Sequence, residues 1–289
     1  MAPKPFPFFF YYYFKKISGS KIPALDIFWK RFFRMSKKLH GRIVKEEDKE
    51  VCYQSNINSK QTQLYIRTKG SSDIQVFSQV FKENEYQSLI EEIHKKNKQA
   101  SIRFIIDAGA NVGYTSVLLK QFFPEAFLLV IEPDNDNTIQ IRKNFEGNHL
   151  QHYDILESGL WSKDCWLNLK KDSDNGKEWS FYVTESEHPT QLKAYTLATV
   201  IKKYPYPFID ILKIDIEGSE NEIFKNKSEI GNILQRTRFL AIEIHDVLAD
   251  RNYILSILKE NNFNWFEHSE LTIATNQSLL NEVILNEFI

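Results

Sequence analysis

The chain has little cysteine and no long apolar run, and each shortage excludes a class of protein. Cys52 and Cys165 are its only cysteines and lie far apart, so neither a disulfide framework nor a cysteine-rich zinc site can be drawn. The longest apolar run is an aromatic stretch of about nine residues near the N-terminus, whereas a membrane-spanning helix needs roughly 20. The same stretch is rich in tyrosine and lacks a small-residue cleavage pattern, so it is a poor signal peptide. We therefore expect a cytoplasmic protein without a transmembrane helix.

The composition of the chain is that of a folded, globular protein. Of the 289 residues, 42% are hydrophobic and 26% are charged, which suffices for one large core and an accessory segment. The net charge of −1 hides an asymmetry, because residues 1–44 hold ten of the 37 basic side chains and only one of the 38 acids. The rest of the chain is therefore acidic. Since a phosphate backbone is best met by a basic surface, we expect no nucleic acid as partner.

The basic part forms an N-terminal extension and linker over residues 1–63. Within it, the apolar spacing over 23–39 predicts a basic amphipathic helix, which suits either an anionic membrane surface or packing on the main domain. The aromatic run before it suits a membrane interface or is a frayed start. Polar residues over 46–50 and 56–63 predict exposed linkers around a short extended piece at 63–67. A helical lead-in over 64–100, with helices at 74–81 and 85–97, then precedes a core over 101–289.

The core alternates strands with helices, which is typical of a doubly wound α/β sheet. Buried strands are predicted at 102–107, 126–132, 153–158, 208–216 and 238–246, and helices at 114–123, 137–148, 219–226 and 249–262. Strands this apolar are buried on both faces, as a parallel sheet requires. Segments 263–269 and 282–288 predict an antiparallel edge. Segments 160–172 and 178–184 predict an inserted β-hairpin, whose Trp179, Phe181, Tyr182 and His188 either stack on a sugar or form the hairpin's own core.

The turn after the first core strand, "DAGANVG", is where such sheets bind ligands. Gly109 and Gly113 remove side chains so that a ligand can approach the backbone, and a helix N-terminus follows. The spacing fits neither the dinucleotide fingerprint nor a phosphate loop, and Asp107 would repel a pyrophosphate but attract an ammonium group. Glu132, at the end of the second strand, can accept both hydroxyls of a ribose. S-adenosylmethionine carries a ribose and a cation and lacks a pyrophosphate, so we predict it as the cofactor.

The segments "DAGANVGYTS", "IEPDNDN", "IDILKIDIEGSE" and "LAIEIHD", in that order, resemble the FkbM family of S-adenosylmethionine-dependent methyltransferases. The resemblance covers about residues 64 to 289 and implies the seven-stranded class I, Rossmann-like methyltransferase fold. It also implies methylation of hydroxyl oxygens, often on sugars or natural products. The residues that it places around the cofactor are Asp107, Gly109, Ala110, Asn111 and Gly113 for the methionine portion, Glu132 and Pro133 for the ribose, and Ser158 and Gly159 near the adenine. One departure is Ala198, which stands where the family commonly has the acid of T-L-D.

Methylating an alcohol requires a base that takes the hydroxyl proton, and the fourth strand offers candidates. Strand alternation would place Lys213, Asp215 and Glu217 on one side, provided that the strand runs that far. A lysine whose pKa is lowered by burial could be the base, although Lys213 could equally only neutralise Asp215. His245, after the fifth strand, suits base catalysis near neutral pH. We predict these four as catalytic residues.

Two further patterns near these residues are a possible helix cap and a group of possible metal ligands. Ser219 and Glu222 match the S-x-x-E capping box of a helix. Asp215, Glu217, Glu243, His245 and Asp246 could together hold a divalent metal, but no spacing specifies one, so none is predicted.

The sequence therefore predicts an O-methyltransferase acting on a hydroxyl of a sugar, glycan or small natural product. The alternative is a methyltransferase-like binding or scaffold protein without catalysis, recruited to a membrane surface by its basic arm. The acceptor, the oligomeric state and the effect of Ala198 cannot be derived from the sequence.

Overall fold

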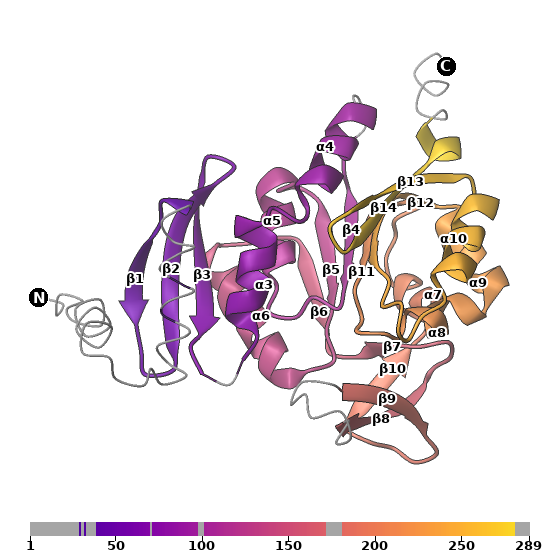
Figure 1. Cartoon of the computed structure of the whole chain (residues 1–289), viewed down its shortest axis with the longest axis horizontal. Coiled ribbons are helices and arrows are strands. Elements are labelled where there is room, and N and C mark those ends of the chain that lie inside the picture. The colour runs from indigo at the N-terminus through magenta and orange to yellow at the C-terminus, as the bar shows by residue number, and fades with distance from the viewer. Residues whose placement is uncertain are drawn as a thin grey trace, which may run out of the picture.

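A computed structural model describes residues 29, 32, 39–69, 71–97, 101–171 and 181–280. Its centre is a seven-stranded sheet in the order β13-β14-β12-β11-β4-β5-β6 (Figure 1). The strands are β4 (Phe104–Ala108), β5 (Phe127–Ile131), β6 (Tyr153–Leu156), β11 (Ile209–Ile214), β12 (Thr237–Glu243), β13 (Phe263–His268) and β14 (Leu271–Asn276). The five strands from β6 to β12 are parallel. β14 runs antiparallel to β12 and to the edge strand β13, so β13 has the same direction as the five core strands. This order confirms the predicted class I methyltransferase fold with an antiparallel edge.

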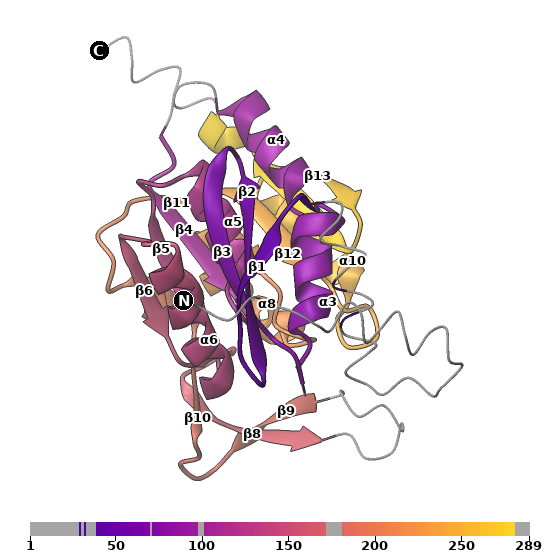
Figure 2. The same ribbon diagram turned by 90° about the vertical axis from the view of Figure 1, so that its left-hand side faces the viewer.

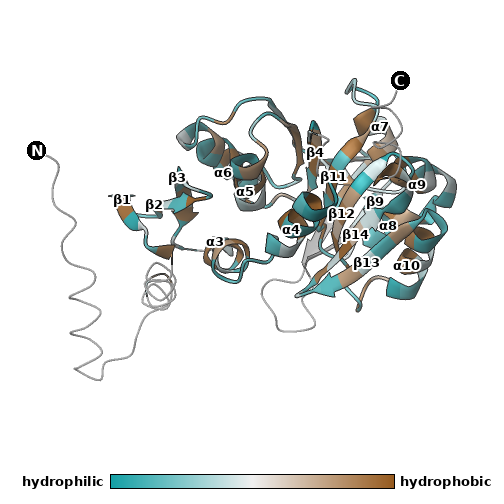
Figure 3. Ribbon diagram, turned by 90° about the horizontal axis from the view of Figure 1, so that it is seen from above, coloured by the Kyte–Doolittle hydropathy of each residue, from teal (hydrophilic) through white to brown (hydrophobic). Residues whose placement is uncertain are grey.

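Side chains on the two faces of the sheet enter two separate cores. Along β11, Ile211 packs into one hydrophobic cluster and Leu212 into the other, as alternation in a strand dictates. One face is covered by α5 (Tyr114–Phe122) and α6 (Asn135–Gly147), and the other by α7 (Leu197–Ile201), α9 (Lys227–Leu234) and α10 (Arg251–Glu260). The strands carry hydrophobic residues while the helices show both hydropathy classes, as amphipathic cover requires (Figure 3). The result is the three-layer sandwich expected for buried parallel strands.

The segment predicted as linker folds instead into a three-stranded antiparallel sheet, which corrects the expectation. Its strands are β1 (Arg42–Glu46), β2 (Glu50–Ile57) and β3 (Lys60–Arg67), so the expected boundary between residues 63 and 64 falls inside β3 (Figure 2). Asn58 and Ser59 both have positive φ, at 48° and 61°, as a tight two-residue hairpin turn requires. Alternate residues of β3 are buried, as is the run Val51 to Tyr53 of β2, and the polar residues around them made the segment resemble an exposed linker.

This N-terminal sheet is fastened to α6 by side-chain amides. Asn144 is fully buried; its Oδ1 accepts from the backbone N–H of Tyr65 at 2.8 Å, and its Nδ2 donates to the carbonyl of Val112 at 2.8 Å. Asn148 Oδ1 accepts from the N–H of Gln63 in the same way. The sheet therefore docks through satisfied polar contacts on the helix that follows the second core strand.

The two lead-in helices are confirmed, with one irregularity. The first is α3 (Asp73–Phe77), which continues as the π-helical turn η1 (Ser78–Lys82), and the second is α4 (Gln87–Lys96). Trp29 and Phe32, the described residues within the predicted basic helix, are helical and buried. Phe32 contacts Tyr53 edge-on at 5.3 Å between ring centroids. These contacts favour packing on the domain; most of the predicted helix, and the aromatic run, lie outside the described residues.

The predicted insert is confirmed and is larger than a hairpin. β7 (Gly159–Leu160), β10 (Leu192–Tyr195), β8 (Cys165–Lys171) and β9 (Phe181–Ser186) form a four-stranded sheet in that order (Figure 1). Trp161 Nε1 donates to Glu185 at 2.9 Å and ties the start of the insert to its far strand. Trp179 lies outside the described residues, as do the side chains of Phe181 and Tyr182, and His188 is exposed. The sugar-stacking hypothesis for the insert therefore stays a prediction.

Two elements differ from the sequence prediction. The second edge strand is β14 rather than residues 282–288, which lie outside the described residues. Helix α9 was not anticipated, because "KSEIGNIL" follows α8 (Glu220–Lys225) so closely that the two appear as one helical pattern. Across the described part of the chain, no helix has both the length and the apolar character needed to cross a membrane.

Candidate active site

The predicted site residues gather where the parallel strands end. Asp107 ends β4, Glu132 follows β5, Asp215 follows β11, and Glu243 and His245 lie at and after the end of β12. Because β5, β4, β11 and β12 are parallel neighbours, their carboxyl ends meet at one edge of the sheet. The site is therefore built from loops that a rigid sheet holds in place.

The turn at 109–113 has the backbone that its glycines predict, for a different reason. Gly109 and Gly113 have φ of 76° and 79°. A Cβ at Gly109 would lie 1.6 Å from the carbonyl oxygen of Asp215, and one at Gly113 would lie 3.2 Å from Ile141. We expected both glycines to clear space for a ligand, but each clears space for the protein's own neighbouring chain. The bend is therefore a packing requirement of the turn before α5.

Lys213 is the centre of a buried ion-pair group. Its side chain is 2% exposed, and its Nζ lies 3.2 Å from Oδ1 of Asp107 and 3.4 Å from Oδ2 of Asp215. The same Nζ donates to the carbonyl of Gly109 at 2.5 Å, and Asp107 Oδ2 accepts from Ser116 at 2.7 Å. These two carboxylates outweigh burial and raise the pKa of Lys213 well above its usual value. The hypothesis of a low-pKa lysine base is therefore wrong, and Asp107 meets any ligand with its charge already balanced.

Glu132 lies beside this turn and is itself almost fully buried. Its Oε2 accepts from the N–H of Asn111 at 2.8 Å, and its Oε1 accepts from the N–H of Asp134 at 3.0 Å and from Asn137 at 3.2 Å. Burial raises the pKa of Glu132 to about 7 despite these donors. The carboxylate is therefore rigidly placed at the end of β5, as a ribose-binding acid must be.

Two buried polar atoms near Glu132 lack partners, which bears on whether a cofactor fits. Asn111 Oδ1 and Ser158 Oγ are both shielded from solvent without a hydrogen bond. Buried polar atoms are nearly always satisfied, so such orphans mark a place where a ligand would supply the partner. Ala110 is buried, Pro133 is exposed, and Gly159 lies in β7. The polar groups required for S-adenosylmethionine are therefore present, with Asn111 and Ser158 on either side of Glu132 in the sequence.

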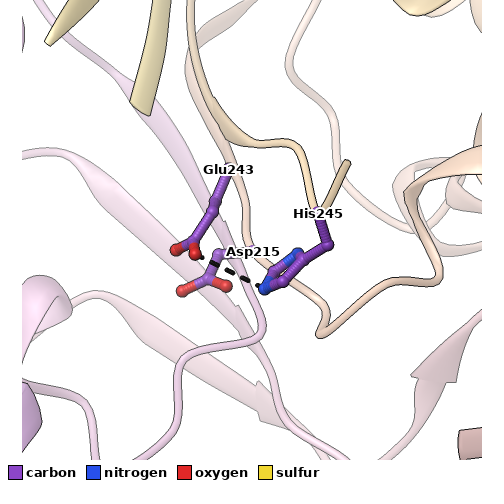
Figure 4. A group of neighbouring side chains, drawn as sticks. All are labelled: Asp215, Glu243 and His245. Atoms are coloured by element: carbon purple, nitrogen blue, oxygen red, sulfur yellow. Dashed lines mark ion pairs between the residues drawn. The ribbon is translucent and has the colours of Figure 1, made fainter. Parts of the chain in front are cut away.

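His245 is held by a buried carboxylate that the sequence analysis did not assign. Its Nδ1 lies 3.0 Å from Oε1 of Glu220, which is fully buried and also accepts from the N–H groups of Ile216 and Gly218. Nε2 then faces Glu243 Oε1 at 3.4 Å and Glu217 Oε2 at 3.6 Å (Figure 4). The hydrogen bond to Glu220 is the main cause that raises the pKa of His245 to about 9. Glu220 is the final acid of the "KIDIEGSE" motif, which was the available signal.

Two expectations at the end of β11 are corrected. The strand ends at Ile214, so Asp215 and Glu217 lie in the following turn, where Glu217 has a φ of 55°. Asp215 still faces Lys213, but the side chain of Glu217 is 83% exposed and reaches His245 instead.

The capping box is also wrong. Ser219 precedes α8 without a side-chain cap bond, and Glu222 accepts from Ser162 Oγ at 3.1 Å. Asp246 is bound by Arg251 at 2.7 Å and turns away from the other acids. Ala198 lies in α7 and packs on the core.

Glu85, in the turn before α4, is a site residue that sequence reasoning missed. It is 7% exposed, and burial together with the charge of Asp215 raises its pKa to about 7. No local pattern marks it, because only the tertiary fold brings the lead-in segment to the edge of the sheet.

The comparison with protein families identifies most of this region. A profile described as "Methyltransferase FkbM domain" matches residues 107–265, more than half of the chain. Methyltransferase sdnD from Sordaria araneosa is 26% identical over 193 residues, which cover 56% of this chain and 73% of that protein. Methyltransferase 1 from Beauveria bassiana (strain ARSEF 2860) is 22% identical over 143 residues, which cover 42% of this chain and 57% of that protein.

Solved structures show a more distant likeness. Methyltransferase FkbM from Methylobacillus flagellatus KT is 19% identical with a TM-score of 0.41, covering 61% of this chain and 43% of that chain. The N-terminal domain of human METTL16, in complex with SAH, is 13% identical with a TM-score of 0.43, covering 88% and 93%. The family match is the stronger finding of the two.

Proposed function

Because the chain belongs to the FkbM family of methyltransferases, we propose that it methylates a hydroxyl oxygen of a sugar, a glycan or a small natural product. Its cofactor is S-adenosylmethionine, which supplies the methyl group on a sulfonium when bound. The remaining question is what the chain's own residues do for the acceptor.

Cofactor placement rests on the first two strand ends. Glu132 would accept from the ribose, and Asn111 and Ser158, whose buried oxygens lack partners, would receive the cofactor's donors. Asp107 would bind the ammonium group of the cofactor while it also pairs with the ammonium group of Lys213, which already lies beside its Oδ1. These residues would thus bind a zwitterionic nucleoside by hydrogen bonds, and the cofactor would supply the methyl group.

The observation that carries the proposal is the oriented histidine. His245 is fixed through Nδ1 by Glu220, so its Nε2 lies among Asp215, Glu217 and Glu243. Such a cluster of acceptors and one imidazole suits a neutral hydroxyl group, which must be oriented and must lose its proton. A phosphate-bearing acceptor would meet only repulsion from these acids. We infer that Asp215 and His245 orient the acceptor and that Glu217 takes up its proton, while Lys213 pairs with both Asp107 and Asp215.

The test is methyl transfer by the full chain. Incubation with labelled S-adenosylmethionine and a panel of sugars, glycans and polyketide-like alcohols should give a product whose label is on oxygen, located by tandem mass spectrometry. Glu217→Gln should lower the rate by roughly 10²- to 10⁴-fold, as loss of an acid–base group does. Asp246→Asn is the matched control, because this acid adjoins His245 in sequence but pairs with Arg251.

The outcome that overturns the proposal is binding without turnover. If S-adenosylhomocysteine binds and no hydroxyl in the panel is labelled, the scaffold alternative gains. A label on nitrogen would keep the methyltransferase and refute the hydroxyl acceptor.

A further inference from the structure

We propose that Asp215, Glu243 and His245 form a divalent-cation site and that the bound cation holds the acceptor oxygen. The cation site stands on its own geometry, while its role toward the acceptor rests on the proposed function. It departs from the sequence prediction, which found no spacing that specifies a metal.

Three ligand types converge in a small volume. One ligand atom from each of Asp215, Glu243 and His245 lies within 4.8 Å of the others, and Nε2 of His245 is 3.4 Å from Oε1 of Glu243 (Figure 4). Two atoms that are each about 2.1 Å from one ion lie roughly 3.0 to 3.4 Å apart, for angles between octahedral and tetrahedral. Glu243 and His245 are thus already at a ligand spacing, and the Asp215 oxygen, within 4.8 Å of both, completes the set.

The ring of His245 is oriented by a contact on the side away from the proposed cation. Metal-binding imidazoles usually donate their second N–H to a carboxylate, which fixes the tautomer and orients the ring. Glu220 provides this contact to Nδ1 at 3.0 Å from a fully buried position, held by two backbone N–H groups of the turn after β11. The other ring nitrogen, Nε2, then faces the carboxylates of Glu243 and Glu217, and a bound cation would replace its proton.

An independent observation comes from Glu85, on the lead-in segment. Its relative exposure is 7%, and no hydrogen bond or ion pair of its carboxylate is found among the described residues. The charge that affects it most is that of Asp215, followed by Glu270, and Glu243 is in turn affected by Asp215 and Glu85. An unpaired buried carboxylate costs several kcal/mol. Lys213 offsets part of that cost, and a divalent cation between Asp215 and Glu243 would offset more of it.

The donor set indicates the class of ion. Two carboxylates with one imidazole suit Mn²⁺ or Zn²⁺ more than Mg²⁺, which prefers oxygen alone. Lys213 occupies Oδ2 of Asp215, which leaves its second oxygen for the ion. Three protein ligands leave positions open for the acceptor, whose oxygen would be polarised. Glu217, exposed and 3.6 Å from Nε2, then remains to take the hydroxyl proton as the oxygen bonds to the methyl carbon and the sulfur keeps the electron pair.

The test is direct binding of Mn²⁺ to the full chain after treatment with a chelator. Titration followed by electron paramagnetic resonance of the free ion should show one site per chain. Glu243→Gln and His245→Gln should weaken it by roughly tenfold or more, since even outer partners of a metal site change affinity by 10- to 100-fold. Asp246→Asn should leave it unchanged. No bound Mn²⁺, or equal affinity in Glu243→Gln and Asp246→Asn, would overturn the proposal.

A second measurement needs no variant. Mn²⁺ added to the wild-type chain at a fraction of an equivalent should broaden the imidazole nuclear magnetic resonance signals of His245 and spare those of His94, which packs beside Phe122 and Phe123. Uniform broadening, or none, would overturn the site. Methyl transfer that persists in chelator would refute the role of the cation and leave the proposed function standing. Specific Mn²⁺ binding without methyl transfer would support the cation site and count against the proposed function.

Discussion

Replacing Lys213 with methionine tests whether the ion-pair group at the centre of the sheet is a structural necessity. Methionine nearly preserves the volume but removes the charge between Asp107 and Asp215. Asp107 is fully buried and would keep only the hydroxyl of Ser116 as partner. Removing one member of a buried ion pair costs about 3–5 kcal/mol because the other charge is left uncompensated. Lys213→Met should therefore lower the free energy of unfolding by about that amount.

The assay is urea unfolding followed by circular dichroism at pH 7, with Lys225→Met as control. Lys225 pairs with Glu222 at the surface, where an ion pair contributes about 0–1 kcal/mol.

The raised pKa of Lys213 fixes how its contribution to the free energy of unfolding changes with pH. The raised pKa of Lys213 means that its contribution is fully present below pH 10.5 and is lost only as the pH rises through the folded pKa. The difference in the free energy of unfolding between Lys213→Met and the wild type should therefore change little between pH 5 and pH 9. Adding Asp107→Asn should recover part of the loss. A destabilisation below about 1 kcal/mol at pH 7, or one that grows in acid, would refute the reasoning.

Three further predictions concern the turn, the ribose acid and the docking of the N-terminal sheet. Gly109→Ala places a Cβ 1.6 Å from the carbonyl of Asp215 at a positive φ, so we expect insoluble or unfolded protein on expression, and a normally folded variant would contradict the structure. Because the pKa of Glu132 is about 7 and only its ionised form accepts both ribose hydroxyls, calorimetric affinity for S-adenosylhomocysteine should fall roughly tenfold per pH unit below 7. Glu132→Gln should remove that dependence; an unchanged slope would exclude Glu132 as its source. Asn144→Ala strands a backbone N–H of β3 and the carbonyl of Val112, which should cost about 2–4 kcal/mol in thermal or urea unfolding, and a loss under 0.5 kcal/mol would contradict the docking role.

The sequence predicts the core well because burial on both faces leaves a plain record. The runs that became β4, β5, β11 and β12 are almost wholly apolar, and each is followed by a helical pattern. The N-terminal sheet was missed for the opposite reason. β2 and β3 each combine a short apolar run with several polar residues beside turn-forming asparagines, and that composition resembles an exposed linker until another surface covers one face.

The positions of the candidate residues at strand ends were predictable, but their pairing was not. Asp107, Lys213, Asp215 and His245 all lie where strand ends placed them. Which cation balances which acid depends on register: β11 sets Lys213 directly beside Asp107 of β4, and no local pattern records that pairing. Glu85 shows the limit most clearly, because it reaches the site only through the packing of helices distant in sequence.

The position of Lys213 also links two events that are usually treated separately. One ammonium group spans Asp107, on the cofactor side, and Asp215, on the acceptor side. A ligand that draws Asp107 toward itself weakens its hold on the lysine and strengthens the hold of Asp215, and the reverse is equally true. Binding free energies are reciprocal. If a ligand at Asp107 changes the affinity for a ligand at Asp215 by some factor, the ligand at Asp215 must change the affinity for the ligand at Asp107 by the same factor.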